Sequence, residues 1–436
     1  MATALRPLGG EEWLLSMQEW DEYPRKCDPE VDVLEDDPAT RSQIAALAAH
    51  GGIDLRLERR GFRVTTTSFV GRVKVGPLTI VVAPKIEHVP MIGLLRYAFG
   101  LHGMAMFDHT SHGTSTLGFE DLLALELAAE VSGLLRRSLS RRYVPRNEEL
   151  SSPRGRIEFE RLACGDRSSA SLPCRHHVRL TDNALNRALL MGLSLARSIC
   201  STGEVRARLH RLREGFDGVT EPRVGLDALK HAAGQVDRTT VSYEPALDLI
   251  EAMMDGTGVS LEEDRPIRLR GFLFDMNRFF QRLLEQFFRH HLAEGTVIAE
   301  RPLRGMLRWD PQHNPGMRRD PKPRPDLAIR CRGGKVELLD AKYQRLGSRP
   351  PSADVMYQLA IYALSRDADG HATILFPGSR VDPKQVLNVS TATKDEQQAR
   401  VILCAVDLEY LHQLLASPGA TQERAAYARH LVFGTE

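Results

Sequence analysis

The sequence predicts a C-terminal α/β domain, built on a mixed sheet flanked by helices, that follows a β-rich and helical N-terminal region. Residues 52–86 are rich in Val, Thr and Ile and carry turn signals at Gly71 and Gly76, which is typical of strands. Leucines recur at helical spacing over residues 119–143. From about residue 270 helical and strand patterns alternate, which indicates an α/β domain.

The composition is that of a globular protein with reduced cysteines. Of the 436 residues, 42% are hydrophobic and 26% are charged, and the net charge is +1. Affinity for nucleic acid would therefore have to come from local patches. The six cysteines form no CxxC pair, the N-terminus lacks a signal-peptide pattern, and no apolar stretch approaches the roughly 20 residues of a membrane span. We expect a cytoplasmic protein that does not enter a membrane.

The chain is expected to divide into three parts. Residues 1–125 should form a β-rich domain that includes a short apolar helix after Pro90. Residues 126–264 should be mainly helical, apart from a turn-rich segment at 144–162. Residues 265–436 should form the α/β domain.

The α/β domain is expected to begin with an amphipathic helix. One stripe of this helix is apolar: Met276, Phe279, Phe280, Leu283, Leu284, Phe287 and Phe288. Strand composition recurs in 296–303, in the two halves of 324–344, in 371–377 and in 398–408. Between them, residues 352–366 predict a second helix with Ser352 as its N-cap.

The segment "RPDLAIRCRGGKVELLDAKYQ" (324–344) carries the candidate active site. Residues i and i+2 of a strand project from the same face, so Asp340 and Lys342 should point together. The preceding strand can bring Asp326 beside Asp340. Two carboxylates and a lysine suit metal-dependent phosphodiester cleavage, because the oxygens hold a hard cation while the lysine positions water and stabilises charge on phosphate. The alternative interpretation is an edge hairpin with a surface ion pair.

Context distinguishes this Asp-x-Lys pattern from the other two in the chain. Asp320-Pro321-Lys322 and Asp382-Pro383-Lys384 each contain a proline, which does not suit a central strand. Asp340 instead ends an apolar run, where an unpaired carboxylate is costly unless it binds something. Glu337 is a weaker candidate than Asp340, because it lies an odd number of residues away and faces the other side of the sheet.

Two polar residues of the following helix are expected to support the site. Asp354, Gln358 and Tyr362 are spaced i, i+4 and i+8, so they share one helix face. Gln358 and Tyr362 could hydrogen-bond the lysine or a phosphate. The alternative is an ordinary polar edge of the helix.

These motifs resemble the PD-(D/E)xK nuclease superfamily, through Pro325-Asp326, Asp340-Ala341-Lys342 and the Gln358–Tyr362 pair. More narrowly, the chain resembles the McrC-like nuclease subunits of McrBC-type, 5-methylcytosine-dependent restriction systems. The stretches that carry this are "FVGRVKVGPLTIVVAPKI" followed by "LLRYAFGL", "PRGRIEFERL" followed by "LPCRHHVRLTDNALNRAL", and "FDMNRFFQRLLEQF". They span roughly residues 60 to 365.

The resemblance implies a Mg²⁺-dependent endodeoxyribonuclease, with Mn²⁺ as an alternative metal, in a modification-dependent restriction system. It implies a C-terminal PD-(D/E)xK domain, and an N-terminal part, residues 1–125, that docks onto an McrB-like AAA+ GTPase. The partner would recognise modified double-stranded DNA. The roles implied are metal ligation by Asp326 and Asp340, catalysis by Lys342 and support by Gln358 and Tyr362.

One position departs from the family pattern. Met276-Asn277 is commonly followed by Leu-Phe-Glu, whose carboxylate can join the metal site, but here Gln281 stands at that position. Glu285, one turn later, is a candidate replacement. Without it, the metal would rely on Asp326, Asp340 and the backbone carbonyl of Ala341, with water completing the coordination.

Two further constellations leave alternatives open. An arginine-rich stretch could bind phosphate or an acidic partner, or could simply be a solvated helix end: Arg136, Arg137, Arg141, Arg142, Arg146, Arg154, Arg156 and Arg161. A zinc site at Cys164, Cys174, His176 and His177 is disfavoured, because the spacing matches no common zinc pattern.

A second basic cluster precedes the proposed metal strand, and for it we favour contact with DNA phosphates. The cluster comprises Arg301, Arg304, Arg308, Arg318, Arg319, Lys322 and Arg324, and the last four are the predicted DNA contacts.

Two other functions remain open from the sequence. The chain could be a non-cutting activator or adaptor that couples the GTPase to DNA, as the missing carboxylate at Gln281 would allow. It could also be a stand-alone PD-(D/E)xK nuclease. The chain has no phosphate-binding loop of its own: Gly333-Gly334-Lys335 lacks the upstream glycine and the hydroxyl residue.

Overall fold

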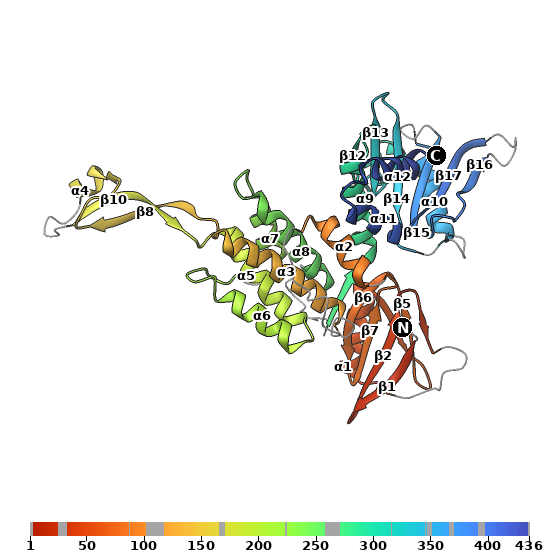
Figure 1. The fold of residues 1–436 in the computed structure, drawn as a ribbon, viewed down its shortest axis with the longest axis horizontal. Coiled ribbons are helices and arrows are strands. Elements are labelled where there is room, and N and C mark those ends of the chain that lie inside the picture. The colour runs from red at the N-terminus through yellow and green to blue at the C-terminus, as the bar shows by residue number, and fades with distance from the viewer. Residues whose placement is uncertain are drawn as a thin grey trace. The chain divides into compact units, whose positions relative to one another are not determined.

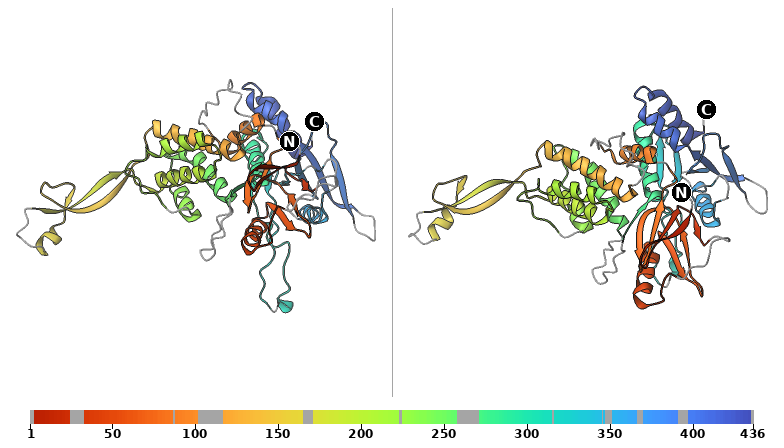
Figure 2. Two further views of the ribbon diagram at one scale, coloured as in Figure 1. Left: turned by 90° about the horizontal axis from the view of Figure 1, so that it is seen from below. Right: turned by 60° about the horizontal axis from the view of Figure 1, so that its bottom comes forward.

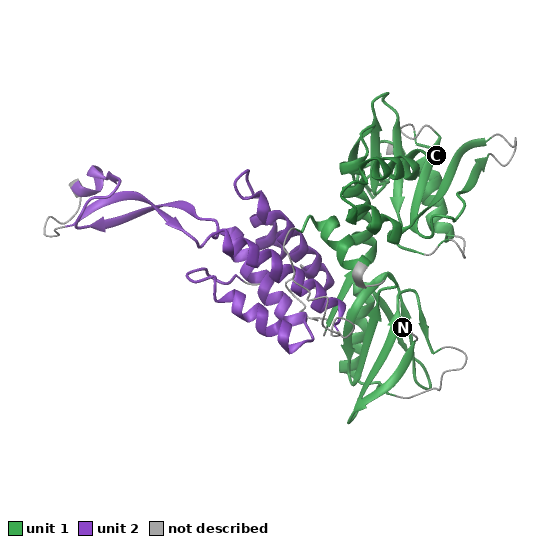
Figure 3. Cartoon of the chain, viewed as in Figure 1, with its two compact units in different colours: residues 1–101, 269–436 green, residues 102–268 purple. Residues whose placement is uncertain are grey.

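A computed structural model describes residues 3–24, 33–86, 88–101, 117–164, 171–222, 225–257, 271–314, 316–344, 346, 351–365, 370–390 and 397–434 (Figure 1). The chain forms two compact units (Figure 3). The first joins residues 1–101 to residues 269–436, and the second is formed by residues 102–268. No helix among the described residues is both long enough and apolar enough to cross a membrane.

This division differs from the predicted three-part order. The predicted boundary at residue 125 falls inside helix α3 (Phe119–Arg136), and the boundary at residue 264 lies outside the described residues. The N- and C-terminal parts of the chain belong to one unit. Strand β11 (Gly271–Asp275) explains why, because it precedes the C-terminal domain in sequence yet pairs antiparallel with β6 (Phe69–Val75) of the N-terminal part.

The N-terminal part of the first unit is β-rich, as predicted. A five-stranded sheet has the order β1-β2-β7-β6-β11, with β1 at Ala4–Gly9, β2 at Glu12–Gln18 and β7 at Leu78–Ala83. A three-stranded sheet has the order β3-β5-β4, formed by Glu22–Tyr23, Phe62–Thr66 and Ile53–Leu57. Helices α1 (Pro38–His50) and α2 (His88–Phe99) complete this part.

The C-terminal part is the predicted mixed sheet flanked by helices. The strands have the order β12-β13-β14-β15-β17-β16: Gly295–Ala299, Leu327–Cys331, Val336–Ala341, His371–Pro377, Gln397–Val406 and Gln385–Ser390. Strands β14, β15 and β17 are parallel, and the remaining neighbours are antiparallel.

Helices cover both faces of this sheet. Helix α10 (Ala353–Ala363) packs on β14, β15 and β17 and shares their apolar core through Leu359 and Tyr362. Helix α9 (Met276–His291) packs on β12 and β14 and contacts α12 (Thr421–Phe433), which in turn contacts α11 (Leu408–Ala416). All seven residues of the predicted apolar stripe of α9 are buried, which confirms the amphipathic pattern.

The second unit is a helical bundle with a long β ribbon. Helix α3 packs against α5 (Ala184–Ile199), α6 (Gly203–Arg213) and α8 (Glu244–Gly256), and α7 (Leu226–Ala233) packs on α5. Within the unit, strands β8 (Arg142–Leu150) and β10 (Leu172–Leu180) extend away from these helices (Figures 1 and 2). Short elements near the ribbon tip are β9 (Arg156–Ile157) and α4 (Phe159–Cys164).

The prediction of turns at 144–162 is wrong for most of β8. This strand pairs with β10 in unbroken antiparallel register from Arg142–Leu180 to Leu150–Leu172. None of its nine residues is buried, so it lacks the alternation of apolar and polar residues by which a strand is recognised in sequence.

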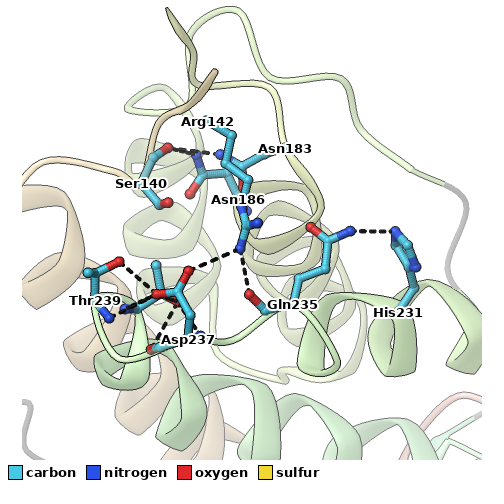
Figure 4. A network of polar contacts seen from close by, with 9 residues as sticks. Ser140, Arg142, Asn183, Asn186, His231, Gln235, Asp237 and Thr239 are labelled. Atoms are coloured by element: carbon cyan, nitrogen blue, oxygen red, sulfur yellow. Dashed lines mark hydrogen bonds and ion pairs between the residues drawn. The ribbon is translucent and has the colours of Figure 1, made fainter. Parts of the chain in front are cut away.

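A polar network fixes the base of the ribbon to the bundle (Figure 4). The side-chain amides of Asn183 and Asn186 both donate to the Ser140 carbonyl, which joins the chain entering β8 to the start of α5. Arg142 donates to the Gln235 carbonyl and also pairs with Asp237 at 3.6 Å. Both ends of the ribbon are therefore held at one place in the bundle.

Candidate active site

The antiparallel pairing of β13 with β14 brings the two predicted carboxylates together. The register places Leu327 opposite Leu339, so Asp326, one residue before β13, falls opposite Asp340. The backbone N–H of Ala341 donates to Asp326 Oδ2 at 2.8 Å. Lys342 Nζ lies 3.0 Å from Asp340 Oδ2. Asp326, Asp340 and Lys342 therefore meet at one end of the hairpin, as the sequence predicted.

Asp340 is buried and has few hydrogen-bond partners for a carboxylate. Its side chain is 1% exposed. Among the described residues Oδ1 accepts no hydrogen bond, while Oδ2 lies 3.0 Å from Lys342 Nζ in a charge-assisted contact. Buried polar atoms are almost always satisfied, because leaving one unpaired costs about 1–3 kcal/mol. Oδ1 is thus open to a ligand, and a surface ion pair does not describe this aspartate.

The charges of the site act strongly on one another. Burial and the neighbouring charge of Asp340 raise the pKa of Asp326 to about 7, while the charge of Lys342 and the N–H of Ala341 act in the opposite direction. Burial lowers the pKa of Lys342, but the charges of Asp340 and Asp326 outweigh it, so that the pKa is raised. The lysine is therefore held in its cationic form beside a pair of crowded carboxylates.

Gln358 and Tyr362 hold the loop that carries Asp326. Gln358 Nε2 donates to the Tyr362 hydroxyl at 2.6 Å, and that hydroxyl donates to the Arg324 carbonyl at 2.9 Å. Tyr362 is 1% exposed, and burial raises its pKa to about 12. The Tyr362 hydroxyl therefore bonds the backbone two residues before Asp326, and among the described residues it forms no hydrogen bond with Lys342.

An open groove runs beside this pair on the surface of α10. It has a volume of about 400 Å³ and is lined by Pro323, Arg324, Asp354, Tyr357, Gln358, Ile361 and Tyr362. The Tyr357 side chain is 68% exposed there. The groove borders the loop that leads to Asp326, but Asp326, Asp340 and Lys342 are not among its lining residues.

The basic residues that precede Asp326 in the sequence lie in the connection between β12 and β13. The four predicted DNA contacts are all exposed: Arg318, Arg319, Lys322 and Arg324. Arg324 pairs with Glu300 at 3.4 Å, and Arg318 lies over the Trp309 ring at 5.8 Å from its centre. These exposed cations lie on the connection that ends at Asp326.

Glu300 is a neighbour of the site that the sequence did not reveal. It follows β12, its backbone N–H donates to the Asp326 carbonyl at 2.8 Å, and its charge adds to the raised pKa of Asp326. Its φ angle of 47° is left-handed, which is uncommon for a residue other than glycine. Nothing in the sequence singled it out, because only the pairing of β12 with β13 brings it close.

Glu285 does not replace the missing carboxylate at Gln281. Its side chain bonds Arg289 one turn along α9, at 2.6 Å. Within the described ranges no three His, Cys, Asp or Glu side chains gather into one cluster that could hold a metal ion by themselves. The structure thus brings together the carboxylates of Asp326 and Asp340. The third metal ligand predicted from the sequence is the backbone carbonyl of Ala341.

The other two constellations resolve differently. His176 and His177 are adjacent on β10 and face opposite sides of it, Cys174 is buried, and the Cys164 side chain lies outside the described residues, so nothing here favours zinc. The arginine-rich stretch is a helix end only at Arg136 and Arg137. Its later members lie along the ribbon, where Arg146 pairs with Glu148 at 3.0 Å.

Comparisons with known proteins agree with this architecture. The chain resembles a chain of the refined half-complex from a tetradecameric assembly of Thermococcus gammatolerans McrB AAA+ hexamers with bound McrC. That match has a TM-score of 0.59 at 18% identity and covers 95% of this chain and 99% of the other, which shows a shared fold. A second match, to the Thermococcus gammatolerans McrBC complex, has a TM-score of 0.46 at 17% identity and covers 64% of this chain and 88% of the other.

No curated protein matches the sequence. The sequence model of the family described as McrBC 5-methylcytosine restriction system component, however, matches residues 64–377, well over half of the chain. The protein therefore belongs to the family of McrBC 5-methylcytosine restriction system components.

Proposed function

We propose that this chain is the Mg²⁺-dependent DNA endonuclease subunit of a modification-dependent restriction system. The observation that carries the proposal is Asp340, whose buried Oδ1 accepts no hydrogen bond from the described residues while Asp326 and Lys342 lie beside it. A site that crowds two carboxylates pays in stability unless a ligand compensates. A hard divalent cation is the ligand that carboxylate oxygens suit best.

Each residue of the site would have its own role in phosphodiester cleavage. Asp326, Asp340 and the Ala341 carbonyl would hold Mg²⁺ or Mn²⁺, which supplies a Lewis acid and a water of lowered pKa. Lys342, cationic and 26% exposed, would orient the attacking water and stabilise the charge that develops on the phosphate. Gln358 and Tyr362 would keep the loop before Asp326 in place.

Double-stranded DNA is the proposed substrate. The exposed arginines and lysine of the β12–β13 connection would hold the phosphate backbone and lead it to Asp326. The family description names 5-methylcytosine, which makes modified DNA the substrate to test first. The chain would act together with an McrB-like AAA+ GTPase, because the structurally similar chain comes from an assembly of McrB AAA+ hexamers with bound McrC.

The test is cleavage of methylated plasmid by this chain, its McrB-like partner, GTP and Mg²⁺. Wild type should cut, whereas Asp340→Ala should lose cutting by about 1,000-fold or more, equivalent to about 4 kcal/mol of transition-state stabilisation. Glu337→Gln is the matched control, because it also alters a buried acid of β14 and should still cut.

Three results would contradict the proposal in different ways. Cutting by Asp340→Ala at the wild-type rate would show that the carboxylates take no part in the reaction. Stimulation of GTP hydrolysis by wild type, without cutting of any modified DNA, would instead favour a non-cutting adaptor. Cutting without any partner would favour a stand-alone nuclease.

A further inference from the structure

Tyr343, the residue after the proposed catalytic lysine, is held at each of its polar groups. Its backbone N–H donates to Asn277 Oδ1 at 2.9 Å, and its carbonyl accepts from Trp20 Nε1 at 3.1 Å. Its hydroxyl donates to Glu19 Oε1 at 3.3 Å. The side chain is buried, with its ring edge-on to Phe280 at 6.0 Å. Such complete attachment fixes the backbone at this residue.

Asn277 provides a hydrogen-bond acceptor to the segment after β14, beyond the point where β13 can pair with it. Strand β13 begins at Leu327, so it offers no backbone partner to the last residues of the β14 segment. Two side chains take its place, because Asp326 accepts from the N–H of Ala341 and Asn277 accepts from the N–H of Tyr343. On the opposite side the N–H of Lys342 donates to the Leu375 carbonyl at 2.9 Å. Lys342 is therefore fixed between two attached neighbours.

The same contacts lead into the N-terminal part of the unit. Asn277 Nδ2 donates to Ser68 Oγ at 2.7 Å, and the N–H of Met276 donates to the Ser68 carbonyl at 3.0 Å. Trp20 has a left-handed φ of 55° and its N–H donates to the Thr67 carbonyl at 3.2 Å, which holds the indole toward Tyr343. Trp20, which follows β2, and Ser68, which follows β5, are thus connected to Tyr343 just beyond β14, Trp20 directly and Ser68 through Asn277.

We propose that Asn277 and Trp20 are positioning residues for Lys342, through Tyr343. This inference rests on the proposed nuclease function for its catalytic consequence. Lys342 lies just beyond the last ladder pair of β14, and a strand end without a partner frays unless its N–H groups find acceptors. Asn277 accepts from the N–H of Tyr343, and Trp20 donates to the Tyr343 carbonyl. The position of the Lys342 ammonium therefore depends on the N-terminal part of the chain.

The inference also gives Asn277 a physical role. At the start of α9 its side chain is half-buried and uses both of its amide atoms, one toward Ser68 and one toward Tyr343. Alanine at this position would leave the N–H of Tyr343 without its acceptor. Aspartate keeps an acceptor of the same shape, so it is the conservative variant.

The first readout measures the position of Lys342 without requiring cleavage. Amine labelling followed by mass spectrometry gives the ratio of Lys342 to Lys335, which lies at the other end of the same hairpin strand. We expect Asn277→Ala to raise this ratio several-fold and Trp20→Phe to raise it less, because phenylalanine keeps the ring and loses only the N–H donor. Asn277→Asp should restore the wild-type ratio, and the controls Asn388→Ala and Trp13→Phe should leave it unchanged.

The second readout is single-turnover cleavage of methylated DNA. Asn277→Ala should slow the cleavage step about 10-fold or more, about 1.4 kcal/mol, with an unchanged Kd for DNA. Asn277→Asp should recover most of the rate.

An unchanged labelling ratio in Asn277→Ala would overturn the linkage, and a changed ratio with an unchanged cleavage rate would overturn its role in positioning. If no protein cuts but the ratio changes as expected, the linkage stands and the proposed function fails.

Discussion

Strand β14 carries two buried acids whose surroundings are opposite. Glu337 is 3% exposed and is fully engaged, by Lys335 at 3.2 Å and by His371 in an ion pair. Burial raises the pKa of Glu337, but the hydrogen bonds and charges of His371 and Lys335 outweigh it and bring the pKa below its ordinary value. Asp340 is 1% exposed, and its Oδ1 accepts no hydrogen bond from the described residues while its Oδ2 contacts Lys342. Its neighbour Asp326 has a raised pKa.

The difference shows that burial by itself does not identify a functional acid. Both side chains lose their hydration, and Glu337 has a protein partner at each oxygen, whereas Asp340 has Lys342 at Oδ2 and no partner among the described residues at Oδ1. A buried carboxylate with an oxygen left unpaired is a candidate for binding something outside the chain. The two acids lie on opposite faces of one strand, so each can be altered as a control for the other.

Substitution of the two lysines that pair with these acids should give the largest difference in the rate of DNA cleavage. Lys342→Gln should slow DNA cleavage by about 100-fold or more, about 2.7 kcal/mol, because the cation beside the phosphate is lost. Lys335→Gln should leave the rate within about twofold, because this lysine pairs with the structural acid. Single-turnover cleavage with the GTPase partner measures both.

Equal losses in the two lysine variants would break the comparison. Melting temperatures and circular dichroism of both variants provide the control for folding. A rate loss in Lys335→Gln with normal folding would show that the Glu337 end of the strand also takes part in the reaction.

The pH dependence of stability should have opposite signs at the two ends. Asp326 has a folded pKa of about 7 against an ordinary 3.8, so its contribution to stability is fully present below about pH 3.8 and is lost as pH rises toward 7. Glu337 has a lowered pKa, so its contribution is present above its ordinary 4.5 and is lost as pH falls through the folded pKa. Denaturant unfolding in EDTA from about pH 3 to 8 measures both.

Two variants assign these slopes. Asp326→Asn should remove the loss of stability between about pH 4 and 7, which is on the order of 4 kcal/mol. Glu337→Gln should remove the loss of stability below its ordinary pKa of 4.5 and leave the loss between about pH 4 and 7 intact. If Asp326→Asn leaves the loss between about pH 4 and 7 unchanged, the crowding of carboxylates at this end of the hairpin is wrong.

Local patterns were sufficient to predict the hairpin and its carboxylates. The period of two along "VELLDAK" placed Asp340 and Lys342 on one face, and the turn at Gly333-Gly334 indicated a preceding strand that can bring Asp326 beside Asp340. The observed register places the two aspartates opposite each other. The stripe on α9 was equally visible, because its period of 3.6 continues over four turns.

Features that depend on distant parts of the chain were not predictable. The partners of Tyr343 lie more than 300 residues away at Trp20 and 66 residues away at Asn277. Strand β8 is exposed on both faces, so no buried side marks it as a strand. Glu300 enters the neighbourhood of Asp326 through sheet pairing alone. In each case the deciding interaction is tertiary, and no local spacing encodes it.

The smallest effect, and the one that separates the two acids most directly, is the stability change of their amide variants. In metal-free protein at about pH 7.5, Glu337→Gln should lower the free energy of unfolding by about 1–3 kcal/mol, because His371 and Lys335 lose a charged acceptor. Asp340→Asn should raise it by about 1 kcal/mol, because the repulsion between the two crowded carboxylates is removed and Asp326 remains to pair with Lys342. Mg²⁺ should then raise the melting temperature of wild type and Glu337→Gln but not of Asp340→Asn. Destabilisation by both substitutions would mean that Asp340, like Glu337, is held by the protein itself and is not reserved for a ligand.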